Sequence, residues 1–194
     1  MARMMTIPNY ITVLRILLIP LFVAAIMYYG QSVKEADPQE WLRWLAISIF
    51  VLASVSDGVD GYLARKFNLQ SLLGRILDPI ADKGLLITAL IALSLSNWPN
   101  PLPIWFPVLV IGRDVVILTG CIVIYLVHGK IEIAPSLVGK MATALQMVVI
   151  SWAMLQVPYI IIPLILAGIA TFVSGIRYIW DAIKSLHPTP EAHD

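Results

Sequence analysis

Long apolar runs separated by short polar breaks make up most of this chain. The runs approach or exceed the ~20 apolar residues that a membrane-spanning helix needs. Because backbone amides and carbonyls in lipid must be satisfied within their own segment, the runs are expected to be helices. The breaks contain residues that end helices: Asp37-Pro38, Asn97-Trp98-Pro99-Asn100-Pro101, the polar stretch 128–137 and Val157-Pro158. The pattern predicts an all-α integral membrane protein with six transmembrane helices, at roughly 10–30, 41–64, 74–96, 103–127, 138–157 and 159–183.

Lysines and arginines near the predicted helix ends collect on one side of the membrane. That side carries Arg3, Arg65, Lys66, Arg75, Lys130, Lys140 and Lys184, whereas the other side carries only Lys34 and Arg43. Since positive residues are enriched in cytoplasmic loops, both the N-terminus and the C-terminus should be cytoplasmic. Indole rings favour the membrane interface, and four tryptophans are expected there at the outer helix ends: Trp41, Trp44, Trp98 and Trp105.

The composition supports the membrane assignment. Hydrophobic residues make up 59% of the chain and charged residues 13%, against about 25% charged residues in a soluble domain. The net charge of +1 creates no field that would attract nucleic acid. The single cysteine, Cys121, lies in an apolar run and is expected to be a buried, inert thiol. We expect the membrane domain to cover 1–186 and a short polar tail to cover 187–194.

Four aspartates interrupt the second and third apolar runs. Asp57 and Asp60 share one face of the second predicted helix with Gly61 and Ala64, because their spacing is i, i+3, i+4, i+7. On the third predicted helix, Gly74, Asp78 and Asp82 follow one another at intervals of four and form a second stripe. The link between the two helices is short, so they should be antiparallel neighbours with the stripes facing each other just inside the cytoplasmic boundary.

The depth of these carboxylates indicates a metal. Asp57 and Asp82 each lie roughly 12 Å along their helix from its cytoplasmic end. Desolvation and mutual repulsion oppose the ionisation of four carboxylates at that depth unless a strong cation is bound. Oxygen ligands select Mg²⁺ or Mn²⁺, and such ions commonly bridge to substrate phosphates. Gly61 and Gly74 leave room for a bulky ligand, and Arg65 could bind phosphate oxygens.

The aspartates belong to one spaced signature, Asp57-x2-Asp60-Gly61-x2-Ala64-Arg65-x8-Gly74-x3-Asp78-x3-Asp82. It resembles, without a departure, the signature of the CDP-alcohol phosphotransferases, whose six-span layout is also similar. The resemblance implies transfer of a substituted phosphate from a CDP-alcohol, usually CDP-diacylglycerol, to the hydroxyl of a second alcohol, with release of CMP. It also implies a homodimer in the bacterial inner (plasma) membrane, with the active site facing the cytoplasm.

The resemblance assigns roles by position. Asp57, Asp60 and Asp78 would hold the divalent metals on the diphosphate. Asp82, counted with these ligands, would also be the general base that takes the proton of the acceptor hydroxyl. The remaining signature positions would form the nucleotide pocket: Gly61, Ala64, Arg65 and Gly74.

Further resemblances concern the acceptor. Asp78-Pro79-Ile80-Ala81-Asp82-Lys83 looks like the DPxADK form of the glycerol-type branch, phosphatidylglycerophosphate synthases and eukaryote-like cardiolipin synthases. Asn9, Thr12 and Arg15 resemble the opening of that branch, and their spacing of three places them on one helix face near the same cavity. Asn9 and Thr12 are assigned to the CDP-alcohol, and the residues assigned to the acceptor are Arg15, Arg113 and Lys140.

Two departures from the synthases keep the acceptor open. Cys121 and Ala142 stand where phosphatidylglycerophosphate synthases often have an arginine and a lysine. A small acceptor phosphate needs cations, so the loss of these two favours phosphatidylglycerol as the acceptor, which would give cardiolipin. Glycerol-3-phosphate is favoured because its use is the commoner activity in this branch. Arg113 and Asp114 lie in the middle of the fourth span, where ionisable residues indicate function. As adjacent residues they are expected to pair poorly with each other, so each should have a partner elsewhere.

Other readings of the aspartates are a structural network with nearby basic residues, an ion path in a transporter, and a non-catalytic lipid-binding scaffold. The acids cluster toward one membrane face, with no matching polar stripe near the other, which argues against a transporter. Metal-dependent release of CMP would separate an enzyme from a transporter, and loss of Asp82 would be tolerated only by a scaffold.

Overall fold

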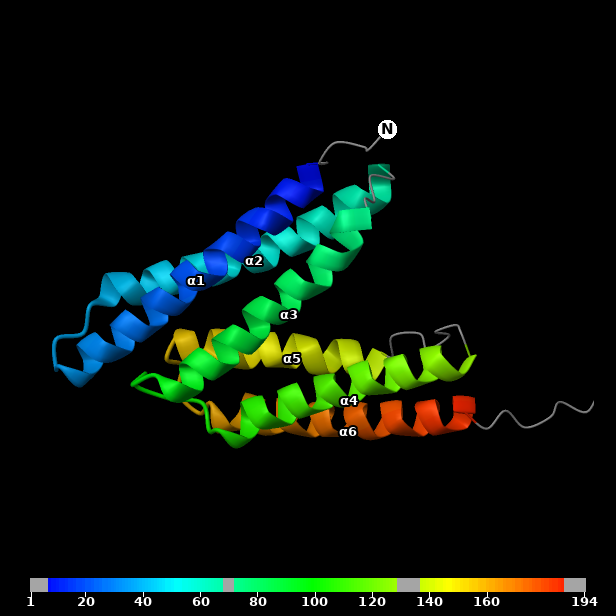
Figure 1. Ribbon diagram of the computed structural model, residues 1–194. Helices are drawn as coiled ribbons and strands as arrows, with labels where there is room; N and C mark the ends of the chain where they lie inside the picture. The colour runs from blue at the N-terminus through cyan, green and yellow to red at the C-terminus, as the bar shows by residue number, and fades with distance from the viewer. Residues whose placement is uncertain (1–6, 68–71, 129–136, 187–194) are drawn as a thin grey trace, which may run out of the picture. The chain divides into compact units, whose positions relative to one another are not determined.

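A computed structural model describes the backbone of residues 7–67, 72–128 and 137–186, and the side chains of these residues except at 7–11, 57–80, 82, 128, 185 and 186. Within these ranges the chain is helical and contains no strand (Figure 1). The helices are α1 (Ile7–Lys34), α2 (Glu40–Phe67), α3 (Leu72–Leu95), α4 (Trp105–His128), α5 (Leu137–Met154) and α6 (Ile161–Leu186). The six predicted helices are therefore confirmed, with ends displaced by a few residues.

Four helices in the described part of the chain contain segments that are long and apolar enough to cross a membrane: Thr12–Lys34, Trp105–Val127, Leu137–Met154 and Ile161–Lys184. A shorter apolar segment, Lys83–Leu95, forms the second half of α3. These lengths and compositions identify the chain as a membrane protein.

The same backbone device ends α1 and α5. Ala36 and Gln156 adopt left-handed conformations, with φ of 60° and 55°. After α1, the amide of Ala36 donates to the carbonyl of Val33 and that of Asp37 to the carbonyl of Ser32, at 3.1 and 3.0 Å. This is a Schellman motif, which satisfies the last carbonyls of a helix, and a proline follows two residues after each left-handed residue.

The chain forms two compact units. The first comprises Met1–Pro103 and Ile150–Val157, and the second comprises Ile104–Val149 and Pro158–Asp194.

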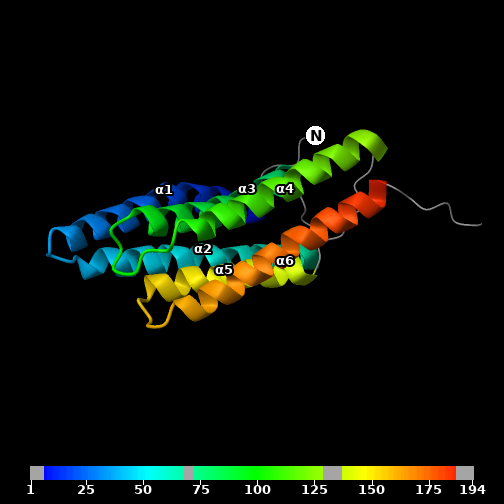
Figure 2. The same cartoon turned by 90° about the horizontal axis from the view of Figure 1, so that it is seen from below.

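In the first unit, α1 contacts both α2 and α3, and α2 contacts α3. Figures 1 and 2 both show α1 and α2 side by side. Phe22 of α1 stacks on Phe50 of α2, with ring centroids 6.0 Å apart. The core of this unit consists of fully buried side chains that include Phe22, Ile26, Tyr29, Leu90 and Leu93. Because lipid tails are as apolar as these side chains, close van der Waals packing supplies the main favourable term that holds these helices together.

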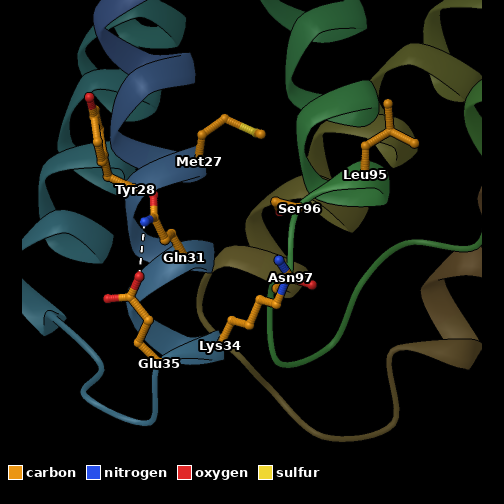
Figure 3. A pocket seen from close by; sticks show the side chains of 8 residues that line it. All are labelled: Met27, Tyr28, Gln31, Lys34, Glu35, Leu95, Ser96 and Asn97. Atoms are coloured by element: carbon orange, nitrogen blue, oxygen red, sulfur yellow. Dashed lines mark hydrogen bonds between the residues drawn. The ribbon is translucent and has the colours of Figure 1, made fainter.

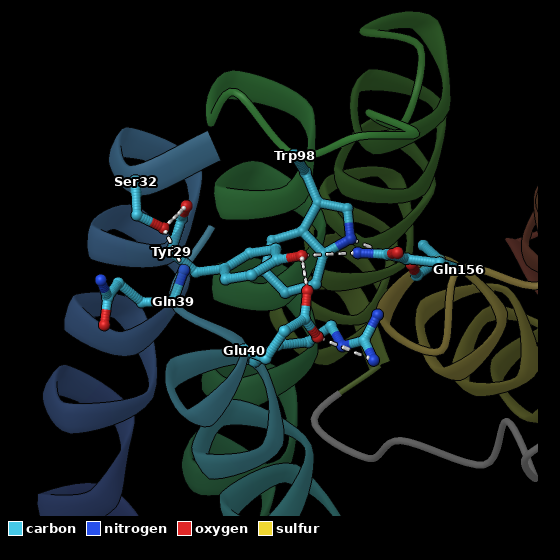
Figure 4. Close-up of polar contacts among 8 residues, drawn as sticks. Tyr29, Ser32, Gln39, Glu40, Trp98 and Gln156 are labelled. Atoms are coloured by element: carbon cyan, nitrogen blue, oxygen red, sulfur yellow. Dashed lines mark hydrogen bonds and ion pairs between the residues drawn. The ribbon is translucent and has the colours of Figure 1, made fainter. Parts of the chain in front are cut away.

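A polar cluster closes one end of the first unit (Figure 4). The Tyr29 hydroxyl donates to Glu40 Oε1 at 3.2 Å and accepts from Gln156 Nε2 at 2.8 Å. Trp98 Nε1 donates to the carbonyl of Ala153 at 3.0 Å, and the indole ring lies 4.6 Å from the ring of Tyr29. The cluster joins α1, the start of α2, the segment after α3 and the end of α5.

Trp98 corrects one prediction from the sequence. Trp41, Trp44 and Trp105 have exposed side chains, as expected for interfacial residues, whereas Trp98 is only 2% exposed. Its ring packs against Tyr29 and its N–H is satisfied by a carbonyl, so Trp98 is a core residue.

In the second unit, α4 contacts α6. Phe106 and Val110 of α4 and Leu164 and Ala167 of α6 are buried. Gly168 permits a close approach, because a Cβ there would lie 3.1 Å from the Trp105 ring.

Candidate functional site

The signature residues lie on two helices of the first unit. Residues 57–65 form the C-terminal part of α2, and residues 74–82 form the N-terminal part of α3. The two helices contact each other, and α3 runs back from the end of α2 (Figure 1). The backbone is helical at every signature position, which is the condition for Asp57 and Asp60 to share one face, and Asp78 and Asp82 another.

The side chains of the signature lie outside those that the structure describes. This holds for Asp57, Asp60, Gly61, Ala64, Arg65, Gly74, Asp78 and Asp82. Their roles as metal ligands, general base and nucleotide pocket stay predictions.

The donor chemistry of the signature suits a hard divalent cation. Its four carboxylates offer only oxygen ligands, the type that Mg²⁺ and Mn²⁺ prefer. Helical backbone on both α2 and α3 gives each carboxylate pair a fixed spacing of three or four residues. The residues present therefore fit the metal that the sequence predicts.

Two polar residues of α1 are buried in this unit. Thr12 is 0% exposed and Arg15 is 2% exposed. Both lie on the helix that contacts α2 and α3. Since an unpaired charge is costly to bury, a cation at this depth indicates interactions with polar or acidic groups. The side chain of Asn9 lies outside the described ones.

Arg113 contradicts the prediction that it would pair poorly with its neighbour. Its Nη1 lies 2.7 Å from Asp114 Oδ1 and its Nη2 donates to Ser174 Oγ at 2.9 Å. The two charged side chains are only 11% and 16% exposed. The flexible arginine side chain reaches the next residue's carboxylate although the two Cα atoms do not share a face. The prediction used residue spacing and neglected side-chain reach.

Two sides of the Arg113 guanidinium are thus engaged, while its Nε is buried and has no hydrogen-bond partner in the described part of the chain. The Arg113 side chain packs close to the α6 backbone, because a Cβ on Gly175 would be in van der Waals contact with Arg113 Cγ, at 3.5 Å. A guanidinium carries five N–H donors, so Arg113 keeps donors beyond those used by Asp114 and Ser174.

A polar row on α6 was not foreseen from the sequence. Ser174 binds Arg113, and Thr171, one turn earlier, accepts a hydrogen bond from Gln146 Nε2 at 2.9 Å. Gln146, Thr171 and Ser174 are each at most 1% exposed. Two features of the sequence could have indicated this row: the spacing of three between Thr171 and Ser174 in an apolar helix, and the glutamine, Gln146, in the apolar run of α5.

Two more residues of the second unit bear on the predicted acceptor site. Cys121 is half-buried, and its sulfur lies 2.9 Å from the hydroxyl oxygen of Tyr178, so the expected fully buried thiol is instead hydrogen-bonded. Lys140 lies in the first turn of α5 with an exposed side chain. Arg113 and Lys140 belong to the second unit and the signature to the first, so their convergence on one site stays a prediction.

Comparison with known proteins identifies the chain's relatives. Residues 5–178 match the family model described as CDP-alcohol phosphatidyltransferase. The chain is 33% identical to the CDP-diacylglycerol–glycerol-3-phosphate 3-phosphatidyltransferase of Bacillus subtilis, over 94% of this chain and 99% of that protein. It is 32% identical to the enzyme of the same name from Escherichia coli K12, over 93% of this chain and 92% of that protein. A probable phosphatidylglycerophosphate synthase of Mycobacterium tuberculosis is 30% identical over 95% of this chain and 85% of its own length.

The match extends over nearly all of the chain and includes both helices that carry the aspartate signature. The resemblance that the sequence suggested is confirmed. The chain belongs to the CDP-alcohol phosphatidyltransferase family, a family of membrane transferases that make phospholipids.

Proposed function

We propose that the protein transfers a phosphatidyl group from CDP-diacylglycerol to glycerol-3-phosphate and releases CMP. The proposal rests chiefly on the complete signature, which lies on two contacting helices of a chain whose full-length relatives carry the name of this activity. The two proposed substrates, CDP-diacylglycerol and glycerol-3-phosphate, are those in the names of these relatives. The proposed chemistry follows from the residue types of the signature.

The carboxylates of Asp57, Asp60 and Asp78, with Asp82 beside them, would hold Mg²⁺ or Mn²⁺. When bound, the metal would offset negative charge on the diphosphate and on the departing CMP. Asp82 accepts the proton of the acceptor hydroxyl. The acceptor oxygen forms a bond to the phosphorus that carries diacylglycerol, the bond from that phosphorus to the CMP oxygen breaks, and CMP leaves with the electron pair.

The pocket for the CDP-alcohol is assigned to residues of three helices: Asn9 and Thr12 of α1, Gly61, Ala64 and Arg65 of α2, and Gly74 of α3. The two glycines would let the nucleotide approach the backbone, and Arg65 would pair with phosphate oxygens. The burial of Thr12 and the contacts of α1 with both signature helices support this grouping.

The phosphate of glycerol-3-phosphate is assigned to Arg113, Lys140 and Arg15. Arg113 supports the assignment best, because Asp114 and Ser174 fix its guanidinium while leaving its Nε without a partner among the described residues. A fixed guanidinium loses little entropy when it binds a phosphate.

The proposed setting is a bilayer crossed by all six helices, with both termini and the active site on the cytoplasmic side of a bacterial inner membrane. The excess of Lys and Arg on that side supports the orientation. In this arrangement the acyl chains stay in lipid while cytidine and glycerol-3-phosphate approach from water. We also propose a homodimer, on the family resemblance alone.

The acceptor is tested by CMP release from purified protein with CDP-diacylglycerol and Mg²⁺ or Mn²⁺. We expect release with glycerol-3-phosphate and none above background with phosphatidylglycerol. Release with phosphatidylglycerol alone would identify a cardiolipin synthase and would make Cys121 and Ala142 markers of that activity. Release with neither acceptor would overturn both assignments.

A further inference from the structure

The first unit has an open cavity far from its aspartate signature. The cavity has a volume of about 750 Å³, within the usual size range of ligand sites. It lies between the C-terminal ends of α1 and α3 (Figure 3) and is lined by Met27, Tyr28, Gln31, Lys34, Glu35, Leu95, Ser96 and Asn97. Leu95 is about 20 Å along α3 from Asp82 at 1.5 Å per residue, so this cavity is separate from the proposed active site.

The lining changes from apolar to polar along the helix axis. Figure 3 shows Met27 and Leu95 at one end of the cavity and Lys34, Glu35 and Asn97 toward the other. Lys34 is the last residue of the apolar segment that is long enough to span a membrane, so the polar end lies at the water boundary. An amphiphile in a bilayer has the same order of polarity, from headgroup to acyl chain.

The polar end carries one charge of each sign. Gln31 Nε2 donates to Glu35 Oε1 at 2.9 Å, which holds the carboxylate at the cavity edge (Figure 3). Within the described residues, Lys34 Nζ makes no hydrogen bond or ion pair with the protein.

Ser96 adds a buried donor to the cavity. It lines the cavity, is 7% exposed, and its Oγ is buried without a hydrogen-bond partner in the part of the chain that the structure describes. Ser96 follows the end of α3 and packs closely on α1, because a Cβ on Gly30 would lie 3.2 Å from Ser96 Cβ. Buried hydroxyls normally have a partner, so this one indicates a ligand oxygen.

We propose that this cavity binds a zwitterionic phospholipid whose headgroup carries a phosphate and a primary ammonium. Lys34 and the Ser96 hydroxyl bind the phosphate, and Glu35 accepts hydrogen bonds from the ammonium. Met27 and Leu95 contact the acyl chains. A headgroup with a negative charge alone leaves Glu35 opposed to it, and a quaternary ammonium lacks the N–H groups that Glu35 accepts.

Native mass spectrometry of the full chain in detergent tests the proposal, with matched phosphatidylethanolamine, phosphatidylglycerol and phosphatidylcholine as probes. We expect phosphatidylethanolamine to bind at least about tenfold more tightly than either of the other lipids, which is the lower end of what one charge-assisted hydrogen bond provides. Lys34→Ala should weaken phosphatidylethanolamine binding about fivefold, and Glu35→Gln should remove the preference over phosphatidylcholine. Lys184→Ala, which removes an exposed lysine from α6, should leave the preference unchanged.

Filling the cavity provides an independent test. Leu95 is 67% exposed, so Leu95→Trp should leave the fold intact while it lowers phosphatidylethanolamine binding to the level of the other lipids. Equal binding of all three lipids by the wild type would overturn the proposal. So would a preference for phosphatidylglycerol that Glu35→Gln strengthens, because that result identifies an anionic-lipid site.

Discussion

Arg113 shows how a single charge is accommodated in an apolar helix. Its guanidinium is neutralised by the adjacent Asp114 and positioned by Ser174 on α6. A pair of this kind carries no net charge and leaves N–H donors available. The same side chain is therefore suited both to stabilise the contact of α4 with α6 and to bind an acceptor phosphate.

Arg113→Ala should raise the KM for glycerol-3-phosphate by about 10- to 100-fold, because one or more charge-assisted hydrogen bonds to the phosphate are lost. Arg113→Lys keeps the charge without the planar fork and should give an intermediate KM. Ser174→Ala removes only a positioning bond and should raise KM a few-fold at most. Steady-state kinetics with varied acceptor measures all three.

The control for these variants is Arg177→Ala, which removes an exposed arginine from α6, three residues after Ser174. We expect its KM to match that of the wild type. An unchanged KM in Arg113→Ala would show that Arg113 only stabilises the helices.

The positions of the helices could be predicted from the sequence because each helix coincides with a long apolar run, a signal to which many residues contribute. Asp37-Pro38 and Val157-Pro158 marked two helix ends, and the left-handed Ala36 and Gln156 supply the physical reason. The burial of Trp98 could not be predicted, since the carbonyl that accepts its hydrogen bond, on Ala153, lies 55 residues away in the sequence.

The candidate site, too, could be predicted from the sequence only in part. The residue types and spacing of the aspartate signature are local properties, and the helical backbone that the spacing requires is confirmed. The partners of Arg113 depend on side-chain reach and on the packing of α4 against α6, neither of which spacing encodes.

Ala36→Gly should stabilise the protein by roughly 1 kcal/mol, because glycine adopts the left-handed conformation without the clash of a Cβ. Ala24→Gly, the same change inside α1, should destabilise it by a similar amount. Thermal unfolding of the detergent-solubilised variants measures the difference. A lower melting temperature for Ala36→Gly would contradict the role assigned to this helix end.

The contact between α1 and the segment that follows α3 should not tolerate a larger residue at Gly30. A Cβ there would lie 3.0 Å from the backbone nitrogen of Asn97, which cannot move without shifting the chain. Gly30→Ala should therefore cost about 1–3 kcal/mol.

Gly112→Ala is the matched control, because no atom lies within 4 Å of the added Cβ. It should be neutral or stabilising by up to about 1 kcal/mol. Equal melting temperatures for the two variants would show that α1 and the segment after α3 do not approach as closely as described.

In the proposed orientation, the aspartate signature and both termini lie on one side of the membrane. Six crossings would return the chain to the side where it starts, and the excess of Lys and Arg predicts that this side is cytoplasmic. The water-soluble substrates of the proposed reaction are then available at the active site.

Reporter fusions in a bacterial host test this topology. A fluorescent protein fused after residue 194 should be bright, and alkaline phosphatase fused there should be inactive. Alkaline phosphatase fused after Pro99, in the segment between α3 and α4, should be active. The reverse pattern would mean that the orientation is wrong.

We propose that the aspartates of the signature carry out metal-dependent phosphatidyl transfer, and CMP release by Asp82→Asn tests this proposal. The wild type should release CMP from CDP-diacylglycerol and glycerol-3-phosphate only with Mg²⁺ or Mn²⁺, and chelation should stop the reaction. Asp82→Asn should lower kcat by about 100-fold or more, because the general base is lost. Asp181→Asn, which changes an exposed aspartate on α6, should retain the wild-type rate. A wild-type rate in Asp82→Asn, or full activity without a divalent metal, would contradict the account.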